Sequence, residues 1–526
     1  MDSEKDKGIN FTNYRARAVM KTDEKNYQNL HSISKKARIL SGISSLLEWD
    51  SETFMPTGAF NIRAQQLETM AGIIHKEQTS TSFRNALSKL VDIESGEFAT
   101  GDLTISQQAA VREWRSDYIK ATKLPSKFVT EFAAATAMAV QVWTEARKKN
   151  AFQRFAPYLE RIVNLSKEKA EYLGYDENAY SALIDLHEPG MTRKKVSELF
   201  GEVKKPILSL LKEISSKKQV DNSFLHGKFP QDKQLAFGQE LLESMGFDMT
   251  NGRLDLSTHP FSSSCHPSDS RITTRIHQSS LMSNILAVLH EGGHSLYEMN
   301  LPKEAYGSPL CEPISFGIHE SQSRWWETLI GQSEPFWKFF LPKLQSSFKG
   351  KLDNVNLNDF YKGINLVEPS FIRVEADEVT YTLHVILRFE LECELIDGSL
   401  NVKDLPEAWN AKMKEYLNIE PKTYSEGCLQ DIHWATGAFG YFPTYTLGNL
   451  YAAHFFTAFE TSFPNWQEKV ASGHLNFIKE WLNQEIHRYG REYSALNLAK
   501  KVTGRNFSAK AYIDYLQSKY KGIYSL

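Results

Sequence analysis

The chain has 526 residues, of which 41% are hydrophobic, so it is long enough to bury a large core. Its 61 basic and 64 acidic residues nearly cancel, and no basic block is interleaved with aromatic residues. This balance argues against a nucleic-acid-binding protein. The most apolar run, at 132–140, is far shorter than the roughly 18 residues that a membrane-spanning helix needs, which argues against a membrane partner.

The N-terminal segment is charged from Asp2 onward and has no apolar stretch of the kind that an export signal requires. The cysteines lie far apart without a CxxC pair, which predicts neither a disulfide framework nor a cysteine-bound metal. Both features favour a cytoplasmic protein. Because no linker or internal repeat divides the chain, we expect a disordered, charge-rich tail at residues 1–30 and one large body at 31–526.

Apolar residues recur at helical spacing along most of the chain, so the sequence predicts a mainly α-helical protein. Clear examples are residues 27–47, 60–76 and 329–348. Turn signals follow Met55, His187 and Leu301. Residues 270–278 alternate β-branched and polar side chains, which predicts one strand of a small sheet whose other strands the sequence does not locate.

The stretch AVLHEGGHSLYE, at 287–298, contains an HExxH pattern. His290 and His294 are four residues apart, so on a helix both imidazoles reach one metal ion, and Glu291 can take a proton from a metal-bound water. Gly292 and Gly293 each weaken a helix by ~1 kcal/mol relative to alanine. We interpret them as bare backbone that an active-site helix needs for close approach by another part of the chain, and we favour a metal site over a chance match.

Two histidines leave a catalytic zinc ion one protein ligand short. The longer three-histidine pattern of metzincins is excluded, because Tyr297 and Asn300 stand at its glycine and histidine positions. We therefore expect a carboxylate from a following helix and choose Glu320. We interpret Glu327 as a surface or ion-paired carboxylate. Polar neighbours able to orient the ligands of a site at Glu320 are His319, Ser321 and Gln322. Weaker candidates for the third ligand are Glu298, Glu304 and Glu312.

Two further segments contain combinations of charged, polar and aromatic residues that solvent exposure alone does not explain. The segment at 371–392 is predicted to be helical, with Arg373 and Asp377 at helical spacing on a neighbouring face. Local evidence favours a plain salt bridge, and the alternative is that Asp377 aims Arg373 at a carboxylate, which its planar guanidinium would bind through two parallel hydrogen bonds. The segment at 427–448 gathers hydrogen-bonding side chains among glycines and predicts a site wall, with Gln430, Asp431, His433, Trp434, Tyr441 and Tyr445.

Five motifs, in this order along the chain, resemble those of the M32 metallocarboxypeptidase family. They are DSRIT at 269–273, HEGGH at 290–294, HESQ at 319–322, IRVEAD at 372–377 and GCLQDIHW at 427–434. Looser similarity extends over nearly all of the chain after about residue 30. The resemblance implies a large, saddle-shaped helical zincin with a central groove and a small β-sheet beside the active site, usually found as a homodimer.

The resemblance also implies a function, which is that of a zinc-dependent carboxypeptidase of broad specificity, although some members work with cobalt. Such an enzyme releases single amino acids from the free C-terminus of peptides by attack of a metal-activated water. By position, His290, His294 and Glu320 would be the metal ligands and Glu291 would activate the water, in agreement with the spacing argument. Arg373 would hold the terminal carboxylate of the substrate, which reverses the local preference for a salt bridge.

The remaining site residues rest on the same resemblance. His433 and Tyr445 resemble the pair that stabilises the oxyanion in related helical metallopeptidases. The strand after residue 269 would offer an edge to which an extended peptide adds as a further strand. Further candidates for substrate binding are Tyr441, Gln430, Asp269 and Arg271. A zinc endopeptidase or dipeptidyl carboxypeptidase of related helical fold is the nearer alternative, and a non-enzymatic peptide-binding protein is the more distant one.

Overall fold

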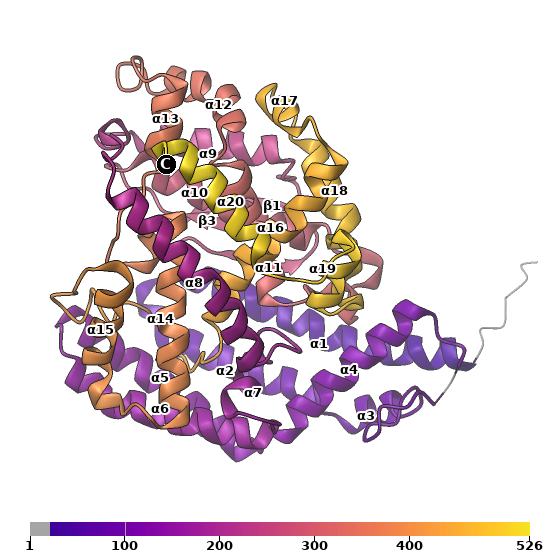
Figure 1. Ribbon diagram of the computed structural model, residues 1–526. Helices are drawn as coiled ribbons and strands as arrows, with labels where there is room; N and C mark the ends of the chain where they lie inside the picture. The colour runs from indigo at the N-terminus through magenta and orange to yellow at the C-terminus, as the bar shows by residue number, and fades with distance from the viewer. Residues whose placement is uncertain (1–21, 100) are drawn as a thin grey trace, which may run out of the picture.

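The computed structural model describes residues 22–99 and 101–526, and most of them lie in helices (Figure 1). In chain order the first α-helices are α1 (Thr22–Glu52), α2 (Phe60–Gln78), α3 (Thr81–Leu87), α4 (Ile105–Lys123), α5 (Ser126–Lys148), α6 (Phe152–Leu173), α7 (Ala179–Ile184), α8 (Arg193–Ser215), α9 (Gln231–Met245) and α10 (Leu281–Met299). They are followed by α11 (Phe316–Arg324), α12 (Glu334–Ser347), α13 (Leu357–Ile364), α14 (Glu378–Asp397), α15 (Leu405–Leu417), α16 (Pro443–Ser462), α17 (Trp466–Ala471), α18 (Asn476–Glu485), α19 (Ala495–Thr503) and α20 (Lys510–Tyr524). The prediction of a mainly helical protein is confirmed.

The N-terminal helix α1 begins earlier than predicted. It starts at Thr22, and its side chains Tyr27 and Leu30 are buried against α3 and α4. Helix α1 thus includes residues 22–30, which belong to the predicted tail, and Tyr27 and Leu30 of this stretch have apolar partners. Residues 1–21 lie outside the described residues. The turn predicted after Met55 joins α1 to α2, which pack against each other as a hairpin.

The strands of the described residues form one three-stranded sheet, made of β1 (Gly252–Leu256), β2 (Ser262–His266) and β3 (Asp269–Thr274). The strand order is β1-β3-β2, with β1 parallel and β2 antiparallel to β3. The predicted strand is thus the central one. Both of its edges are paired, so the prediction that it offers a free edge to a substrate is wrong.

The sheet lies against the helix that carries the HExxH pattern, as expected. The hydroxyl of Ser270 contacts that of Ser295, and Thr274 Oγ1 donates to Asn284 Oδ1 at 2.8 Å, so one face of β3 packs on α10. The opposite face packs on α1, where the Arg271 guanidinium lies 4.7 Å from the ring centre of Trp49. The small sheet therefore joins the N-terminal hairpin to α10.

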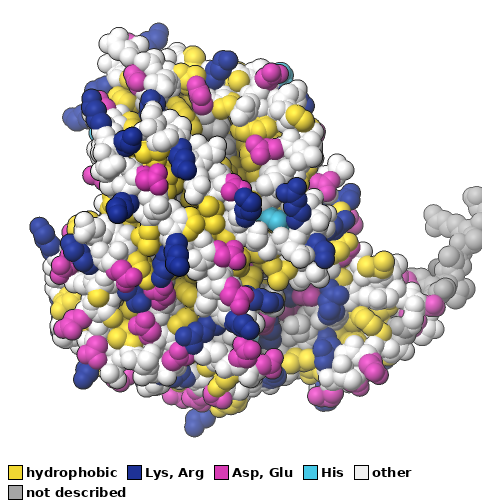
Figure 2. Space-filling view, in the orientation of Figure 1, with side chains coloured by type: hydrophobic (Ala, Val, Ile, Leu, Met, Phe, Trp, Pro, Cys, Tyr) yellow, Lys and Arg dark blue, Asp and Glu magenta, His cyan; other side chains and the backbone are white. Residues whose placement is uncertain are grey.

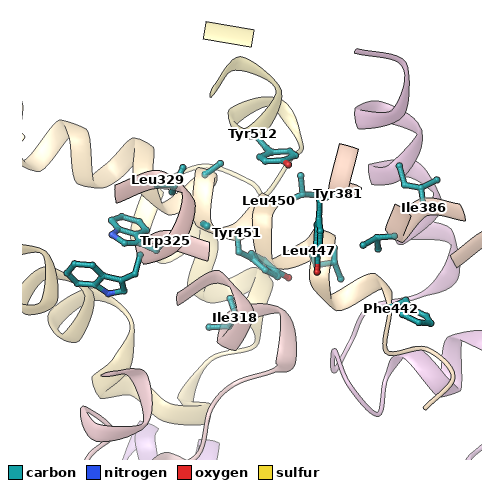
Figure 3. Close-up of a cluster of buried hydrophobic side chains, with 14 of the residues drawn as sticks. Ile318, Trp325, Leu329, Tyr381, Ile386, Phe442, Leu447, Leu450, Tyr451 and Tyr512 are labelled. Carbon is teal, nitrogen blue, oxygen red and sulfur yellow. The ribbon is translucent and has the colours of Figure 1, made fainter. Parts of the chain in front are cut away.

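One large core runs through the helices from Phe128 to Tyr524, and a smaller one joins α1, α3 and α4. Figure 3 shows the part of the large core in which Ile318 of α11 lies beside Tyr451 of α16. On the face drawn in Figure 2, acidic and basic side chains are interspersed, and the surface is hollowed between the main body and the arm that carries α3 and α4. Helices α10, α11 and α16 meet within the large core and so have little freedom to shift.

Two segments predicted as continuous helices are interrupted. The helix predicted at 329–348 consists of a π-helical turn, η5 (Trp325–Ile330), and of α12 after a break at Gly331. A Cβ atom at Gly331 would collide with the Leu289 side chain, so the close approach of α10 explains this glycine. The segment at 371–377 forms only a short 3₁₀ turn, η6 (Arg373–Glu375), before α14 begins.

The four cysteines are free and buried. In the described part of the chain, no helix combines the length and the apolar character that crossing a membrane requires.

Candidate metal centre and active site

Three predicted metal ligands lie together. His290 and His294 come from consecutive turns of α10, and Glu320 comes from α11. One ligand atom from each lies within 4.8 Å of the others. Glu320 Oε2 is 3.6 Å from His290 Nε2 and 3.3 Å from His294 Nε2. The structure therefore brings two imidazoles and a carboxylate to one point.

These three residues fit a divalent metal ion by the chemistry of their donor atoms. Two imidazole nitrogens and one carboxylate are the protein ligands of a common class of catalytic zinc site, which leaves a position for water or substrate. Glu320 is buried, and its Oε1 has no hydrogen-bond partner. A buried carboxylate oxygen without a partner is costly unless a cation neutralises it.

The neighbouring helix explains how Glu320 reaches this point. The Ser315 hydroxyl caps α11 by accepting from the Ile318 backbone N–H at 3.1 Å. Helix α16 crosses at Gly448, where a Cβ atom would lie 2.6 Å from Glu320 Cβ. Only glycine allows the two helices to approach so closely beside the ligand.

The two glycines of the HEGGH motif also allow close packing, in agreement with their interpretation as bare backbone for a close approach. A Cβ atom at Gly293 would lie 2.5 Å from the backbone oxygen of Gln322, and one at Gly292 would lie 2.8 Å from Leu242 Cδ2. The glycines let α10 pack closely against α11 and α9. Gly293 thus lets the two helices that carry the candidate ligands approach each other, and Gly292 makes room for α9.

His290 is held by a charged pair behind it. Its Nδ1 lies 2.7 Å from Glu327 Oε2, and the same oxygen accepts from Arg324 Nη1 at 2.7 Å. The interpretation of Glu327 as an ion-paired carboxylate is confirmed, but it is not a surface residue, because its side chain is only 16% exposed. Such a carboxylate fixes the ring orientation of a ligating histidine.

Glu291 lies on α10 next to the ligand His290 and is 7% exposed. It does not belong to the group of ligand atoms. Burial raises the pKa of its carboxyl to about 7. Its place in the chain and its burial match those of a general base that works beside a metal without binding it.

Arg373 is buried and held by a different acid from the one predicted. Its Nε and Nη2 donate to Asp431 Oδ1 at 3.2 and 2.9 Å, and its Nη1 donates to the Tyr381 hydroxyl at 3.1 Å. Asp377 instead caps α14 by accepting from the backbone N–H groups of residues 379 and 380. The predicted salt bridge between Arg373 and Asp377 is therefore wrong. The segment is not helical there, so the assumed spacing does not apply.

Asp431 also binds a second buried arginine that sequence reasoning missed. Arg388 Nε donates to Asp431 Oδ2 at 2.7 Å, and Arg388 is fully buried. Burial opposes ionisation of Asp431, but the two guanidinium groups outweigh it and hold its pKa far below the usual range. The one sequence signal for Arg388 was a cation inside the apolar run LHVILRF. Two cations thus share one carboxylate.

His433 and Tyr445, the pair named by the resemblance, lie next to each other. His433 Nε2 lies 3.0 Å from the Tyr445 hydroxyl, and the Arg373 guanidinium lies 4.6 Å from the ring centre of Tyr445. Burial lowers the pKa of His433 to about 3, so its imidazole is neutral at pH 7. Burial raises the pKa of Tyr445 and of Tyr441, which packs edge-on against Tyr445, so both hydroxyls stay protonated.

Gln430, Asp269 and Arg271, which the sequence predicted to bind substrate, make hydrogen bonds within the protein. Gln430 Oε1 accepts from the Arg373 backbone N–H at 2.9 Å, and its amide nitrogen donates to backbone carbonyls, so it supports the loop of Arg373. Asp269 and Arg271 bind each other at 2.7 and 2.9 Å on the face of β3 turned away from α10. These contacts favour a structural role for Gln430, Asp269 and Arg271.

A mainly helical fold, an HExxH helix and a glutamate from a later helix together define a metallopeptidase of the helical zincin class. The model of the carboxypeptidase Taq (M32) metallopeptidase family matches residues 29–520. The chain belongs to this family, as its motifs indicated, and it is a metal-dependent carboxypeptidase.

Named relatives agree with this placement over nearly the whole chain. The chain is 41% identical to thermostable carboxypeptidase 1 of Thermus thermophilus, over 96% of this chain and 100% of the relative. It is 37% identical to carboxypeptidase 1 of Bacillus subtilis, over 92% of this chain and 95% of the relative. The crystal structure of the M32 carboxypeptidase from Deinococcus radiodurans superposes with a TM-score of 0.92 at 35% identity, covering 95% of this chain and 100% of that one.

Proposed function

We propose that this carboxypeptidase is a zinc enzyme of broad specificity that releases single amino acids from the free C-terminus of peptides. In this proposal His290, His294 and Glu320 hold the metal. The observation that carries the proposal is the convergence of three ligand atoms within 4.8 Å, one of them on a buried carboxylate with an unpartnered oxygen. Cobalt would suit the same donors.

The chemistry at the scissile bond follows from where the side chains lie. When bound, the metal lowers the pKa of a water molecule toward neutrality and polarises the peptide carbonyl. Glu291, buried beside the ligands, takes the proton from that water and passes it to the leaving amine. His433, which is neutral, and the protonated Tyr445 donate hydrogen bonds to the negative charge that develops on the carbonyl oxygen.

Arg373 sets the register by binding the terminal carboxylate of the substrate. A guanidinium carries five N–H groups, and Asp431 and Tyr381 take three of them. Because Arg373 and Arg388 share one carboxylate, the pair retains positive charge in a buried setting. A buried positive charge favours an anionic partner strongly, which supports recognition of a free C-terminus.

The first experiment compares a mixed-sequence peptide with a free C-terminus and its C-terminally amidated twin, analysed by mass spectrometry. We expect a ladder that loses one residue at a time from the free peptide, no cleavage of the amide, and no cleavage of either with a chelator present. Adding zinc or cobalt back should restore activity. Internal cuts in both peptides would indicate an endopeptidase, and release of residue pairs would indicate a dipeptidyl carboxypeptidase.

The family resemblance also leads us to propose a cytoplasmic homodimer that acts on peptides. Light scattering at increasing protein concentration tests the oligomeric state. A mass of one chain at all concentrations would reject the dimer.

A further inference from the structure

The two ligand histidines have different partners on the side away from the metal position. His290 Nδ1 faces the carboxylate of Glu327 directly, at 2.7 Å. His294 Nδ1 faces another histidine, His319 of α11, with 2.5 Å between the two Nδ1 atoms. The second nitrogen of His319, Nε2, lies 3.1 Å from Glu298 Oε1. On this side of its ring, away from Glu320, His294 therefore reaches an acidic group through His319.

The hydrogen-bond pattern of this chain of residues is determined once His294 binds a metal through Nε2. A neutral imidazole has one N–H and one acceptor nitrogen, so Nδ1 of His294 carries its proton and donates to His319 Nδ1. His319 then carries its own proton on Nε2 and donates it to Glu298. Each hydrogen bond sets the tautomer of the next ring, and the Glu298 carboxylate accepts the last hydrogen bond in the series.

The surroundings hold His319 in this position. Its ring stacks on that of His294, with centroids 4.5 Å apart and planes 30° apart, and it also contacts the buried Tyr297 ring. The side chains of His319 and Glu298 are 20% and 16% exposed, so water has limited access to the bonds between them. Figure 1 shows that α10 and α11, which carry these residues, lie next to each other.

We propose that His319 is a positioning residue that connects the metal ligand His294 to Glu298 and thereby fixes the ring orientation and tautomer of that ligand. This inference rests on the proposed role of His294 as a ligand. The sequence predicted that His319 helps to orient the ligands, and the structure indicates which one: His319 contacts His294, whereas Glu320 receives a hydrogen bond from the Ser323 hydroxyl at 3.0 Å.

The test measures the zinc dissociation constant of full-length variants by competition with a chelator of known affinity. His319→Leu removes both ring nitrogens, whereas His319→Asn keeps an acceptor oxygen close to the position of Nδ1. We expect His319→Leu to weaken zinc binding roughly 10- to 100-fold and His319→Asn to recover most of that loss. Glu298→Gln should give an intermediate value, because its amide oxygen still accepts but carries no charge.

Two controls separate a positioning role from a loss of folding. His474→Leu changes an exposed histidine on the loop before α18, and it should leave zinc affinity unchanged. The melting temperature of each variant in excess chelator reports the metal-free fold. If His319→Leu also lowers that temperature, the zinc affinities still test the inference, which predicts that His319→Asn binds zinc more tightly than His319→Leu and less tightly than wild type. Equal affinity in the two variants would overturn the inference.

The experiment also separates this inference from the proposed function. Zinc affinity of His319→Leu within twofold of wild type would overturn the positioning role alone, provided that His294→Leu loses zinc. Retention of zinc by His294→Leu would overturn the ligand assignment itself and this inference with it.

Discussion

Among the single residues, Glu291 allows the sharpest separation of binding from chemistry. Glu291→Gln keeps the size of the side chain but removes the base, so zinc should stay bound while kcat falls roughly 10²- to 10⁴-fold. Metal content by elemental analysis and turnover of a free peptide measure the two effects independently. Turnover close to that of wild type would rule out Glu291 as the base.

Substitutions of Arg373 and Asp377 should have different effects, because these two residues do not form the salt bridge that the sequence suggested. The first should affect activity and the second only stability. Arg373→Lys keeps the charge but loses the planar fork, so kcat/KM for peptides with a free C-terminus should fall by roughly 10-fold or more. Asp377→Ala removes the cap of α14 and should lower the free energy of unfolding by about 1 kcal/mol without changing KM. If Asp377→Ala changed KM, this result would instead support a contact between Asp377 and Arg373 in the enzyme.

At the scale of elements, the interface between α10 and α11 depends on glycine. A Cβ atom at Gly293 would meet the backbone oxygen of Gln322 at 2.5 Å, and backbone cannot move aside as a flexible side chain can. We expect Gly293→Ala to lower the melting temperature and zinc occupancy together. The matched control is Gly201→Ala in α8, where a Cβ atom meets nothing within 4 Å and where alanine should stabilise the helix by up to ~1 kcal/mol. If Gly293→Ala and Gly201→Ala changed the melting temperature and the zinc occupancy equally, Gly293 would have no special role in packing α10 against α11.

At the scale of the whole molecule, stability should depend on pH through buried carboxyl groups that join distant segments. Glu188, which follows α7, accepts from the Gly317 backbone N–H of α11 at 2.9 Å and from the Tyr451 hydroxyl of α16 at 3.1 Å. Burial raises the pKa of Glu188 from 4.5 to about 7. The folded chain therefore holds this proton more tightly than the unfolded chain does.

Proton linkage determines whether this group makes the folded state more or less stable as the pH rises. Below pH 4.5 both states are protonated, and between pH 4.5 and 7 only the folded state keeps the proton, so stability falls as the pH rises through this window. The free energy of unfolding of wild type should fall by about 3 kcal/mol relative to Glu188→Gln over this range. Denaturant titrations at several pH values measure the difference. A constant difference between the two proteins would contradict the raised pKa.

Local sequence patterns predicted a good share of the site. The helical spacing of His290 and His294, and the polar setting of Glu320, were enough to predict ligands that the structure brings within reach of one another. His433 and Tyr445, which the family resemblance named as a pair, also lie next to each other. His290 and His294 lie on one regular helix, and His433 and Tyr445 belong to one short segment, so in these pairs spacing along the chain reflects distance in space. Glu320 lies on a second helix, and its approach depends on the packing of α11 against α10.

Other features could not be predicted, because they depend on contacts between segments far apart in the chain. Asp431 pairs with Arg373 across 58 positions, and β3 is a central strand only because β1 and β2 flank it. The glycines of the HEGGH motif show the difference most clearly. The sequence by itself determined that the two histidines lie on the same face of this helix, since i and i+4 positions share one face of any helix. Only the tertiary structure decided why glycine stands between them, because that reason is the backbone of α11 packed against α10 at 2.5 Å from the missing Cβ.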